Sequence, residues 1–554
     1  MMIRQQQHRR QLTLRTCFQK CFTLLCLLCL FASAHASEVN SFEDVERSFA
    51  QRNFAQKAAA IEWLISAHHP QTKPILQGLL DRELAYQKGT GTLVLLQGDA
   101  ILTFNTEGAV PPHSAHKQDY KKVTINNSLR TLIQRRLSTL DISAADPSVR
   151  LKAVKALTGK TEPDLIAALQ HQLETETDPA NHSALETAIA IGEFHQHIQT
   201  PVTAENKSQI LTLIQVLNDA GHPAAQLSLQ QAMPTTDDPD IRQQIRQALS
   251  DYEQRQRLYS SIETLYFGLS LGSVLVLAGI GLAITFGVMG VINMAHGELI
   301  MLGAYTTYVM QQLMPSQPGT ALLLAIPAAF MVSGLVGVAI ERSVIRFLYG
   351  RPLETLLATF GISLILQQAV RSIFSPLNRS VATPDFMQGM LEITPMLSLT
   401  WNRLIIIGFS LLIFTLLLLV LKKTALGLQV RAVSQNRAMA RAMGVRSERV
   451  DAMTFGLGAG IAGIAGVALS QLTNVGPNMG QSYIIDSFMV VVFGGVGNLW
   501  GTLVAGLSLG IFNKVLEPWA GAVLAKILVL IFIILFIQKR PRGLFPQRGR
   551  AVES

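Results

Sequence analysis

The chain has 554 residues, of which 49% are hydrophobic and 15% charged, and its formal net charge at pH 7 is +9. These averages conceal two halves: Ser37–Glu253 holds 19 Lys+Arg and 26 Asp+Glu, whereas the residues from Gln254 onwards hold 22 and 11. The positive charge therefore belongs to the N-terminal segment and to loops beside long apolar runs. It is no evidence for a nucleic-acid groove, and we expect no nucleic-acid partner.

Residues 1–36 have the pattern of a signal peptide. Five basic residues precede the apolar run Cys21–Phe31, and Ala34-His35-Ala36 offers a small-x-small cleavage site. An uncleaved anchor is the alternative, and either form predicts export of the next part of the chain. All four cysteines lie in this segment, so cleavage would leave no thiol for a disulfide or a metal, and we expect no metal site and no cofactor. They are Cys17, Cys21, Cys26 and Cys29.

Residues 37–255 are predicted to form an exported, mainly helical domain. Apolar residues in Phe42–Leu64 recur every three to four positions, which predicts an amphipathic helix with a break near Asn53. Thr92–Phe104 is rich in β-branched and apolar residues around Gly98-Asp99, which predicts one small hairpin.

Three Asp-Pro pairs mark helix starts in the rest of this domain, at Asp146, Asp178 and Asp238. Aspartate can cap a helix and proline fits its first turn. The first and third pairs lead into helices predicted to end at Ala156-Leu157 and Ala248-Leu249. This repetition resembles HEAT-type repeats, which stack into a short solenoid.

Residues 256–554 contain nine apolar segments, which predict a polytopic bundle of membrane helices. A full crossing needs about 20 residues, so the shorter segments are either re-entrant or broken. The segments are Leu265–Gly287, Glu298–Met310, Thr320–Ile340, Thr355–Ile373, Leu404–Leu421, Met453–Leu472, Ile484–Gly497, Thr502–Leu516 and Ala522–Ile537.

Basic loops predict the orientation of this bundle, because Lys and Arg favour the cytoplasmic side. An exported N-terminal domain and a cytoplasmic tail require an odd number of crossings, and nine segments place all the basic loops on one side. The basic residues are Arg342, Arg346 and Arg351 in one loop, Lys422, Lys423, Arg431, Arg437, Arg441, Arg446 and Arg449 in the longest, and Lys539, Arg540, Arg542, Arg548 and Arg550 in the tail.

The stretch Val288–Tyr308 places three polar side chains, Asn293, His296 and Glu298, between apolar runs and among small residues. A lone carboxylate inside a membrane span costs about 3 kcal/mol or more, so such groups face a protein interior or a watery path. One interpretation is a glycine-lined turn close to a transport path. The other is a hairpin at the membrane interface, where His296 and Glu298 meet lipid headgroups.

The loop Leu421–Val450 is both basic and amphipathic. Small residues on one face would allow a protein partner to dock closely, and the alternative is a basic helix lying on anionic lipid. The residues that recur at roughly helical spacing are Gly427, Arg431, Ala432, Asn436, Ala440 and Gly444.

Several blocks of the second half resemble the permease subunits of ABC importers for branched-chain amino acids. The blocks are FGVMGVINMAHGELIMLGAY (Phe286–Tyr305), TLLATFGISLILQ (Thr355–Gln367), GLQVRAVSQNRAMARAMGV (Gly427–Val445), VVFGGVGNLWGTLVAG (Val491–Gly506) and RPRGLF (Arg540–Phe545). A signal peptide and a helical domain ahead of the permease are similar to the permease subunits of urea ABC transporters. GTLVLLQGDAILTF and DPSVRLKAVKAL carry that second resemblance.

The resemblance implies a bacterial inner-membrane subunit that works by alternating access, with its N-terminal domain in the periplasm. It implies a second, homologous permease subunit, two cytoplasmic ATPases and an exported solute-binding protein as partners, besides the membrane lipid. The loop from Gly427 would couple the ATPases to the permease, and this chain would be no enzyme itself. Urea needs hydrogen-bonding groups rather than charge pairs along its path. Candidates are Asn293, His296, Glu298, Gln367, Asn474, Asp486 and Asn498.

Three alternatives to a urea importer remain open at this point. A branched-chain amino-acid permease would share the architecture and use paired charges in its site. A membrane-anchored sensor would need more than the short cytoplasmic tail. A passive urea channel would not need the long docking loop.

Overall fold

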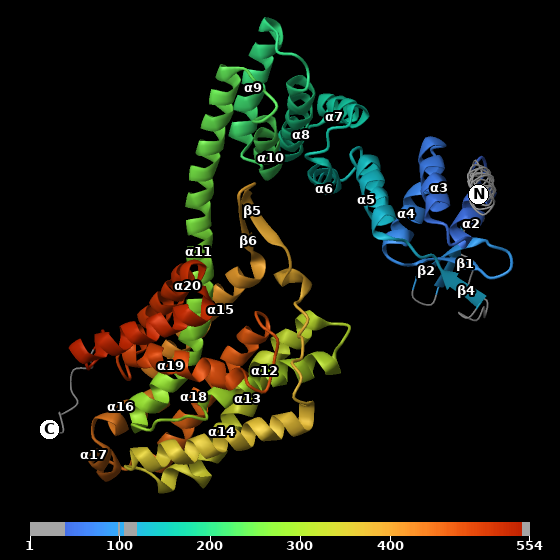
Figure 1. The fold of residues 1–554 in the computed structure, drawn as a ribbon. Helices are drawn as coiled ribbons and strands as arrows, with labels where there is room; N and C mark the ends of the chain where they lie inside the picture. Colours follow the sequence, from blue (N-terminus) through green and yellow to red (C-terminus); the bar gives the residue numbers. More distant parts are fainter. Residues whose placement is uncertain (1–38, 98–99, 105–118, 546–554) are drawn as a thin grey trace, which may run out of the picture. The chain divides into compact units, whose positions relative to one another are not determined.

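The computed structural model describes residues 39–97, 100–104 and 119–545, and Figure 1 shows their course. The predicted signal peptide and its cysteines lie outside these residues. The chain divides into two compact units, Met1–Leu249 and Ser250–Ser554. Both units are mostly helical in their described parts.

The first unit begins with three helices and a small sheet. The predicted break near Asn53 is confirmed, because its side chain accepts a hydrogen bond from Ala55 N and starts a new helix. The predicted hairpin is also present, with Gln97 opposite Ala100, although its turn residues lie outside the described part. It is not isolated, since two further short strands complete a sheet in the order β3-β2-β1-β4. The elements are α2 (Phe42–Ala50), α3 (Phe54–Ser66), α4 (Thr72–Leu80), β1 (Leu84–Gln87), β2 (Leu93–Gln97), β3 (Ala100–Thr103) and β4 (Tyr120–Lys122).

Six more helices come next, and the predicted Asp-Pro starts are confirmed. Asp146 and Asp178 cap their helices by accepting hydrogen bonds from backbone N–H groups, and proline is the first residue of each. A HEAT-type arrangement of these helices stays a prediction. They are α5 (Asn127–Asp141), α6 (Pro147–Leu157), α7 (Pro163–Thr175), α8 (Pro179–Ile198), α9 (Ala204–Ala220) and α10 (Pro223–Ala232).

The prediction that the third Asp-Pro helix ends at Leu249 is wrong. α11 runs from Pro239 to Met289 without interruption. α6 ends at Leu157 as predicted, because Gly159 comes soon after it with φ +90°, a left-handed conformation that glycine adopts readily. No glycine or proline follows Leu249 closely, and the helix continues until Gly290, at φ +67°.

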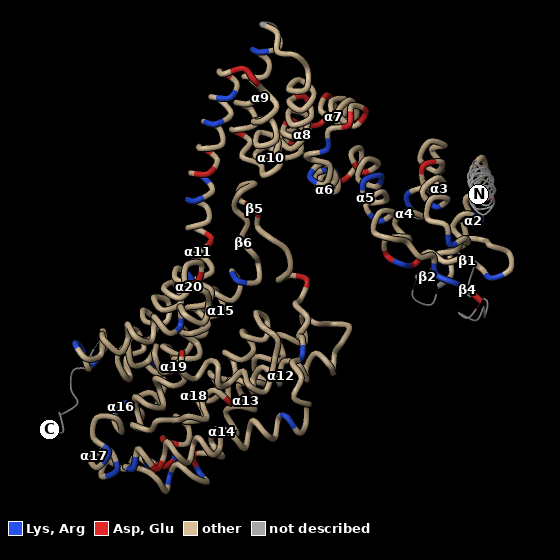
Figure 2. The backbone as a smooth tube through the Cα atoms, in the orientation of Figure 1, with Lys and Arg blue, Asp and Glu red and all other residues tan. Residues whose placement is uncertain are grey.

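The second unit is a helix bundle with one β-hairpin, which the sequence analysis did not predict. Figure 2 shows many of its charged residues near α17 and the neighbouring helix ends, and others along the first part of α11. After α11 the elements are α12 (His296–Leu313), α13 (Pro318–Ser343), the 3-10 turn Ile345–Phe347, α14 (Pro352–Phe374), the 3-10 turn Asp385–Met387, β5 (Met390–Thr394), β6 (Leu397–Thr400), α15 (Trp401–Lys423), α16 (Ala425–Gln435), α17 (Arg437–Ala442), α18 (Ser447–Ser470), α19 (Met479–Gly494) and α20 (Leu499–Lys539).

Within the described residues, six helices are long and apolar enough to cross a membrane. They are α11, α13, α14, α15, α18 and α20. α12 and α19 are shorter, as expected from their apolar segments. Each of the nine predicted segments lies mainly within a helix, but nine crossings stay a prediction.

α20 is two antiparallel legs rather than one long rod. Gly521 interrupts it with φ 76° and ψ 162°. The rings of Phe512 and Phe532 lie 5.9 Å apart, whereas 20 residues of straight helix would separate them by about 30 Å. The Asn498 side chain also donates to Phe545 O, 3.2 Å away, so the two ends of the hairpin meet. The segments Thr502–Leu516 and Ala522–Ile537 are therefore separate legs.

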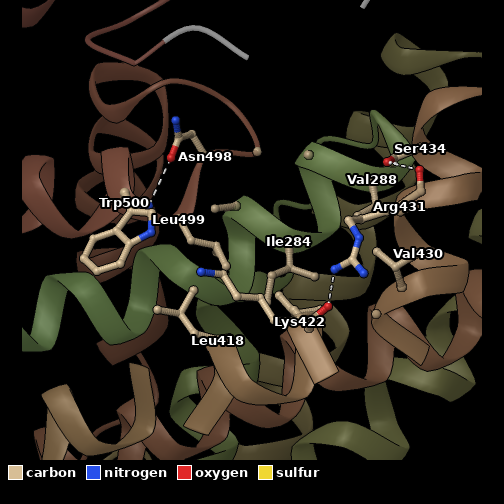
Figure 3. Close-up of a pocket in the computed structure, with 15 residues that line it drawn as sticks. Ile284, Val288, Leu418, Lys422, Val430, Arg431, Ser434, Asn498, Leu499 and Trp500 are labelled. Carbon is tan, nitrogen blue, oxygen red and sulfur yellow. Dashed lines mark hydrogen bonds between the residues drawn. The ribbon is translucent and has the colours of Figure 1, made fainter. Parts of the chain in front are cut away.

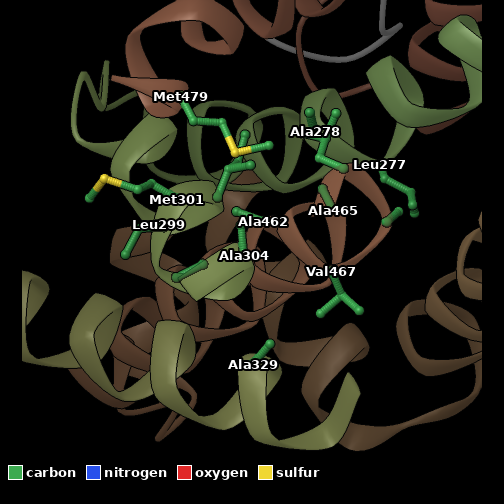
Figure 4. Packing of buried hydrophobic residues seen from close by; sticks show 14 of the residues in the cluster. Leu277, Ala278, Leu299, Met301, Ala304, Ala329, Ala462, Ala465, Val467 and Met479 are labelled. Atoms are coloured by element: carbon green, nitrogen blue, oxygen red, sulfur yellow. The ribbon is translucent and has the colours of Figure 1, made fainter. Parts of the chain in front are cut away.

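α18 lies at the centre of the bundle and packs on α12 and α13 through glycine. A Cβ atom on Gly303 would stand 2.0 Å from Gly463 O, and one on Gly466 would stand 2.0 Å from Ile300 O. Such contacts let helix backbones approach closely. Around them Leu299, Met301, Ala462 and Ala465 form part of the largest buried apolar cluster (Figure 4).

One ion pair in the first unit joins α6 to the end of α7. Arg150 donates from Nε and Nη2 to the two carboxylate oxygens of Glu176, at 2.8 and 2.7 Å, and only 1% of the Glu176 side chain is exposed. The same carboxylate accepts from the backbone N–H groups of Thr177 and Asp178. The hydrogen bonds from Arg150, with those from the backbone, lower the pKa of Glu176 from 4.5 to about 2.

We expect this pair to make the stability of the first unit dependent on acid pH. A carboxyl whose folded pKa is depressed stabilises the fold fully above its unfolded pKa and loses that contribution as pH falls towards the folded value. The protection factors of amides in α6–α8, which correct for the pH dependence of intrinsic exchange, should therefore fall from about pH 4.5 down to about pH 2. Glu176→Gln should be less protected at neutral pH and show a flatter pH profile. Equal profiles for the two proteins would contradict the assignment.

Candidate functional site

The turn between α11 and α12 is held by its own polar residues. Gly290 supplies the left-handed conformation that ends α11. Asn293 is buried, and its Oδ1 accepts from Ala295 N at 3.0 Å, so this side chain shapes the turn before α12 begins. Asn293, His296 and Glu298 are each at most 1% exposed, so the turn is buried in the bundle, and its closeness to a transport path stays a prediction.

His296 fastens the start of α12 to α11. Its Nε2 lies 2.9 Å from Ala278 O and donates to this carbonyl, while the ring is fully buried. The ring also approaches Gly281, where a Cβ would stand 2.8 Å from Cε1. His296 therefore has a structural contact on one side, and its Nδ1 has no partner within the described residues.

Glu298 lies in the first turn of α12, between two other helices. Ser363 Oγ of α14 donates to its Oε1 at 3.1 Å. On the other side Gly480 of α19 comes so close that an added Cβ would stand 2.7 Å from Oε2. Only 1% of Glu298 is exposed.

A stripe of polar residues runs along α14 opposite these groups. Residues spaced by four lie on one face of a helix. Thr359 Oγ1 accepts from Met294 N at 3.1 Å, and Arg371 Nη2 donates to Gln367 Oε1 and to Asn478 Oδ1 at 3.1 and 2.6 Å. The stripe consists of Thr355, Thr359, Ser363, Gln367 and Arg371, the first four of which are at most 5% exposed.

We call the α14 stripe, together with Asn293, His296, Glu298 and Asn478, the polar seam. Several of its buried atoms have no hydrogen-bond partner within the described residues: Asn293 Nδ2, His296 Nδ1, Glu298 Oε2 and Gln367 Nε2. Buried polar atoms are nearly always paired with protein or water. The seam therefore has capacity to bind water or a small polar solute.

Three of the seven predicted path residues lie outside the polar seam. Asn474 is exposed. Asp486 of α19 is 5% exposed and pairs with Lys526 Nζ of α20 at 2.9 Å. Asn498 caps α20 by accepting from Trp500 N and Gly501 N. Asp486 and Asn498 thus have structural contacts in the bundle, and a place for these three residues on the solute path stays a prediction.

Ser363, Arg371, Asn478 and Lys526 are further polar residues of these contacts that were not predicted from the sequence. The first two could have been found from their spacing of four residues on either side of Gln367, which places all three on one helix face. Lys526 is the only charged residue in Ala522–Ile537. A single charge in an apolar segment indicates a partner of opposite charge. Asn478 gives no such signal, because only the fold brings it to Arg371.

The predicted docking loop forms α16, α17 and the turn into α18. Two of its small residues face inwards: Gly427 packs on Leu421, whose carbonyl oxygen would stand 2.0 Å from an added Cβ, and Ala440 is 5% exposed. Asn436 caps α17 through Met439 N, and Gly444 takes φ +86° in the turn. Gly427, Ala440 and the partly buried Ala432 thus pack within the chain, whereas Arg431, Asn436 and Gly444 are exposed. A docking role for this loop stays a prediction.

The outer side of this segment carries large apolar residues instead. Leu428, Met439 and Met443 are 64%, 62% and 79% exposed. Behind them Arg437 donates to Asp451 and stacks over Tyr349, 3.8 Å from the ring centre, which anchors α17 to the bundle. We call Leu428, Met439 and Met443 the apolar docking patch, since exposed apolar residues are candidates for an interaction site.

We expect Ser363→Ala to destabilise the bundle, because a buried carboxylate loses its donor. The loss should be about 1–3 kcal/mol, visible as a lower unfolding temperature of the detergent-purified protein. Ser372→Ala is the matched control: it lies on the same helix, is exposed and donates only to Gln368 O. Equal unfolding temperatures for the two variants would show that the Ser363–Glu298 bond contributes nothing.

Comparisons with known proteins agree with the second unit's architecture. Residues 264–537 match the family model described as branched-chain amino acid transport system / permease component. BraD of Pseudomonas aeruginosa, a high-affinity branched-chain amino acid transport system permease protein, is 29% identical over 300 residues, which cover 52% of this chain and 96% of BraD. LivH of Escherichia coli K12, a permease protein of the same description, is 28% identical over 299 residues, which cover 51% of this chain and 94% of LivH.

A more distant relative is the ribose import permease protein RbsC of Bacillus subtilis, which is 33% identical over 110 residues. These cover 19% of this chain and 34% of RbsC. No solved structure matches. Through residues 264–537, the chain belongs to the branched-chain amino acid ABC permease family.

Proposed function

We propose that this chain is a permease subunit of an ATP-driven importer and that it moves a small polar solute by alternating access. The family match and the membrane-length helices support the class. The polar seam supports the role, because it places hydrogen-bonding atoms without protein partners deep in an otherwise apolar bundle. Multi-pass insertion in the inner membrane follows from the same class, with the first unit proposed to be periplasmic.

Branched-chain amino acids are the first candidate solutes. The seam carries a carboxylate at Glu298 and a guanidinium at Arg371, and one α14 stripe connects them through Ser363 and Gln367. A zwitterion presents an ammonium and a carboxylate, which complement these charges. Paired charges of this kind are what we expect for an amino-acid path rather than a urea path, and BraD and LivH are both named for this transport.

Urea is the second candidate, and the first unit is the observation that favours it. BraD and LivH align over about 300 residues that cover 96% and 94% of their own lengths, so the first unit has no counterpart in them. The resemblance to urea permease subunits rests on that same unit. Amide-like groups of urea would pair with Gln367 Nε2 and Asn293 Nδ2, whose hydrogen-bonding capacity is unused by described residues.

Uptake of radiolabelled leucine and urea by a strain lacking this chain, with and without complementation, separates the candidates. We expect complementation to restore leucine uptake, and Arg371→Gln to reduce it about tenfold or more by removing a charged partner. Arg403→Gln, which removes an arginine stacked on Phe267 outside the seam, is the control. Restored urea uptake without leucine uptake would establish the second candidate, and restoration of neither would refute both.

Two ATPases, a second permease subunit and an exported solute-binding protein complete the proposed importer. The apolar docking patch is the proposed contact for one ATPase, because Arg437 and Asp451 hold α17 rigidly against the bundle. A sensor or a passive channel would give this patch no partner, and both are therefore less well supported.

We expect Met443→Glu to release the ATPase, because a carboxylate in an apolar contact loses its hydration. Affinity purification of the membrane complex should recover several-fold less ATPase with this variant. Gln435→Glu introduces the same group on the exposed side of α16 and should retain the ATPase. If Met443→Glu retains it as well, the docking patch is not the contact.

A further inference from the structure

A pocket of about 350 Å³ lies where α11, α15, α16 and α20 meet (Figure 3). Its walls are mainly apolar and include Ile284, Leu418, Leu421 and Leu499. Trp500 forms one edge and is 53% exposed. Neither the transport path nor the docking patch uses this pocket.

Two basic side chains line the pocket, Lys422 from α15 and Arg431 from α16. Figure 3 shows Lys422 extending towards Leu499 and Trp500, with Arg431 on the other side of Ile284. Among the described residues, no acceptor or acid pairs with the Lys422 ammonium. Arg431 donates through Nη1 to Leu421 O, and its other two guanidinium nitrogens have no acceptor among the same residues. Both side chains are exposed, so their charges are available to a ligand.

Apolar walls with unpaired cations at the end of a membrane-length helix fit one kind of ligand. Leu418 and Leu421 belong to the last turns of α15, immediately before Lys422. Tryptophan is enriched at the membrane–water interface, where its ring lies among headgroups. Basic pockets between membrane helices on the cytoplasmic side bind acidic headgroups.

We propose that this pocket binds an anionic glycerophospholipid. Lys422 and the free donors of Arg431 contact the phosphate, and an acyl chain lies along Ile284, Leu418 and Leu499. Since Gly427 packs directly on Leu421 at the pocket wall, the lipid also supports the joint between α15 and α16. The proposal is independent of which solute the permease carries.

Trp500 makes occupancy measurable, because it is one of four tryptophans and lines the pocket. The full chain carrying Trp63→Phe, Trp401→Phe and Trp519→Phe would be reconstituted into phosphatidylcholine vesicles. Brominated phosphatidylglycerol or brominated phosphatidylcholine would then be added as the quencher. We expect Trp500 fluorescence to be quenched at a several-fold lower fraction of the brominated anionic lipid than of the neutral one.

Lys422→Gln should weaken this preference roughly five-fold, the effect of removing about one basic residue near an anionic surface. Lys423→Gln is the matched control, since it removes the same charge from the next residue, which does not line the pocket. Arg431→Lys, which keeps the charge but loses the planar guanidinium, provides a second variant if Lys422→Gln folds poorly.

The proposal predicts loss of preference with Lys422→Gln or Arg431→Lys and full preference with Lys423→Gln. Equal quenching by the two lipids would overturn it, as would equal losses with Lys422→Gln and Lys423→Gln, which would indicate general surface charge. Protection of Trp500 from both quenchers in the assembled importer, but not in the isolated chain, would assign the pocket to a protein partner and also overturn it.

Discussion

Close backbone contact between α18 and its two neighbours is the constraint on which the second unit depends. At Gly303 and Gly466 a carbonyl oxygen of the facing helix occupies the space that a side chain would need. Lipid supplies little hydrophobic force between helices, so membrane bundles rely on packing and on hydrogen bonds between helices. α12 and α18 are in contact through glycine, and this places the start of α12 in the interior.

The polar seam is a consequence of that placement. Once α12 begins inside the bundle, Asn293, His296 and Glu298 must find partners among neighbouring helices. α11 supplies a carbonyl to His296, and α14 supplies a hydroxyl to Glu298. These hydrogen bonds hold the turn in place. Other polar atoms of the same side chains have no hydrogen-bond partner among the described residues, so the seam keeps hydrogen-bonding capacity.

The apolar docking patch and the pocket share one joint between α15 and α16. Gly427 lets the chain reverse tightly against Leu421. Gly427 and Ala440 are buried, and Leu428, Met439 and Met443 lie outside. The same reversal brings Lys422 and Arg431 to the rim of one pocket. Three exposed apolar residues and an apolar pocket with two basic residues thus belong to a single structural element.

Much of the local structure could be predicted from the sequence. Asn53 and the Asp-Pro pairs mark helix starts because a side-chain oxygen there satisfies the first N–H groups, and this chemistry needs no distant residue. The apolar segments identify the membrane helices for a similar reason, since a backbone in lipid must satisfy its own hydrogen bonds. The break at Gly521 between the two legs of α20 could also be predicted, because it lies between the apolar segments Thr502–Leu516 and Ala522–Ile537.

The tertiary structure alone decided which polar residues meet. Asn293, Glu298 and Gln367 share the seam, whereas Asp486 pairs with Lys526 and Asn498 caps α20, although all of them look alike as polar residues among apolar ones. Likewise, helical spacing showed that small residues of the α16–α17 segment form one face, but not whether that face turns inwards or outwards. Periodicity along one helix fixes which residues lie together on it, and only packing against other helices fixes what that face touches.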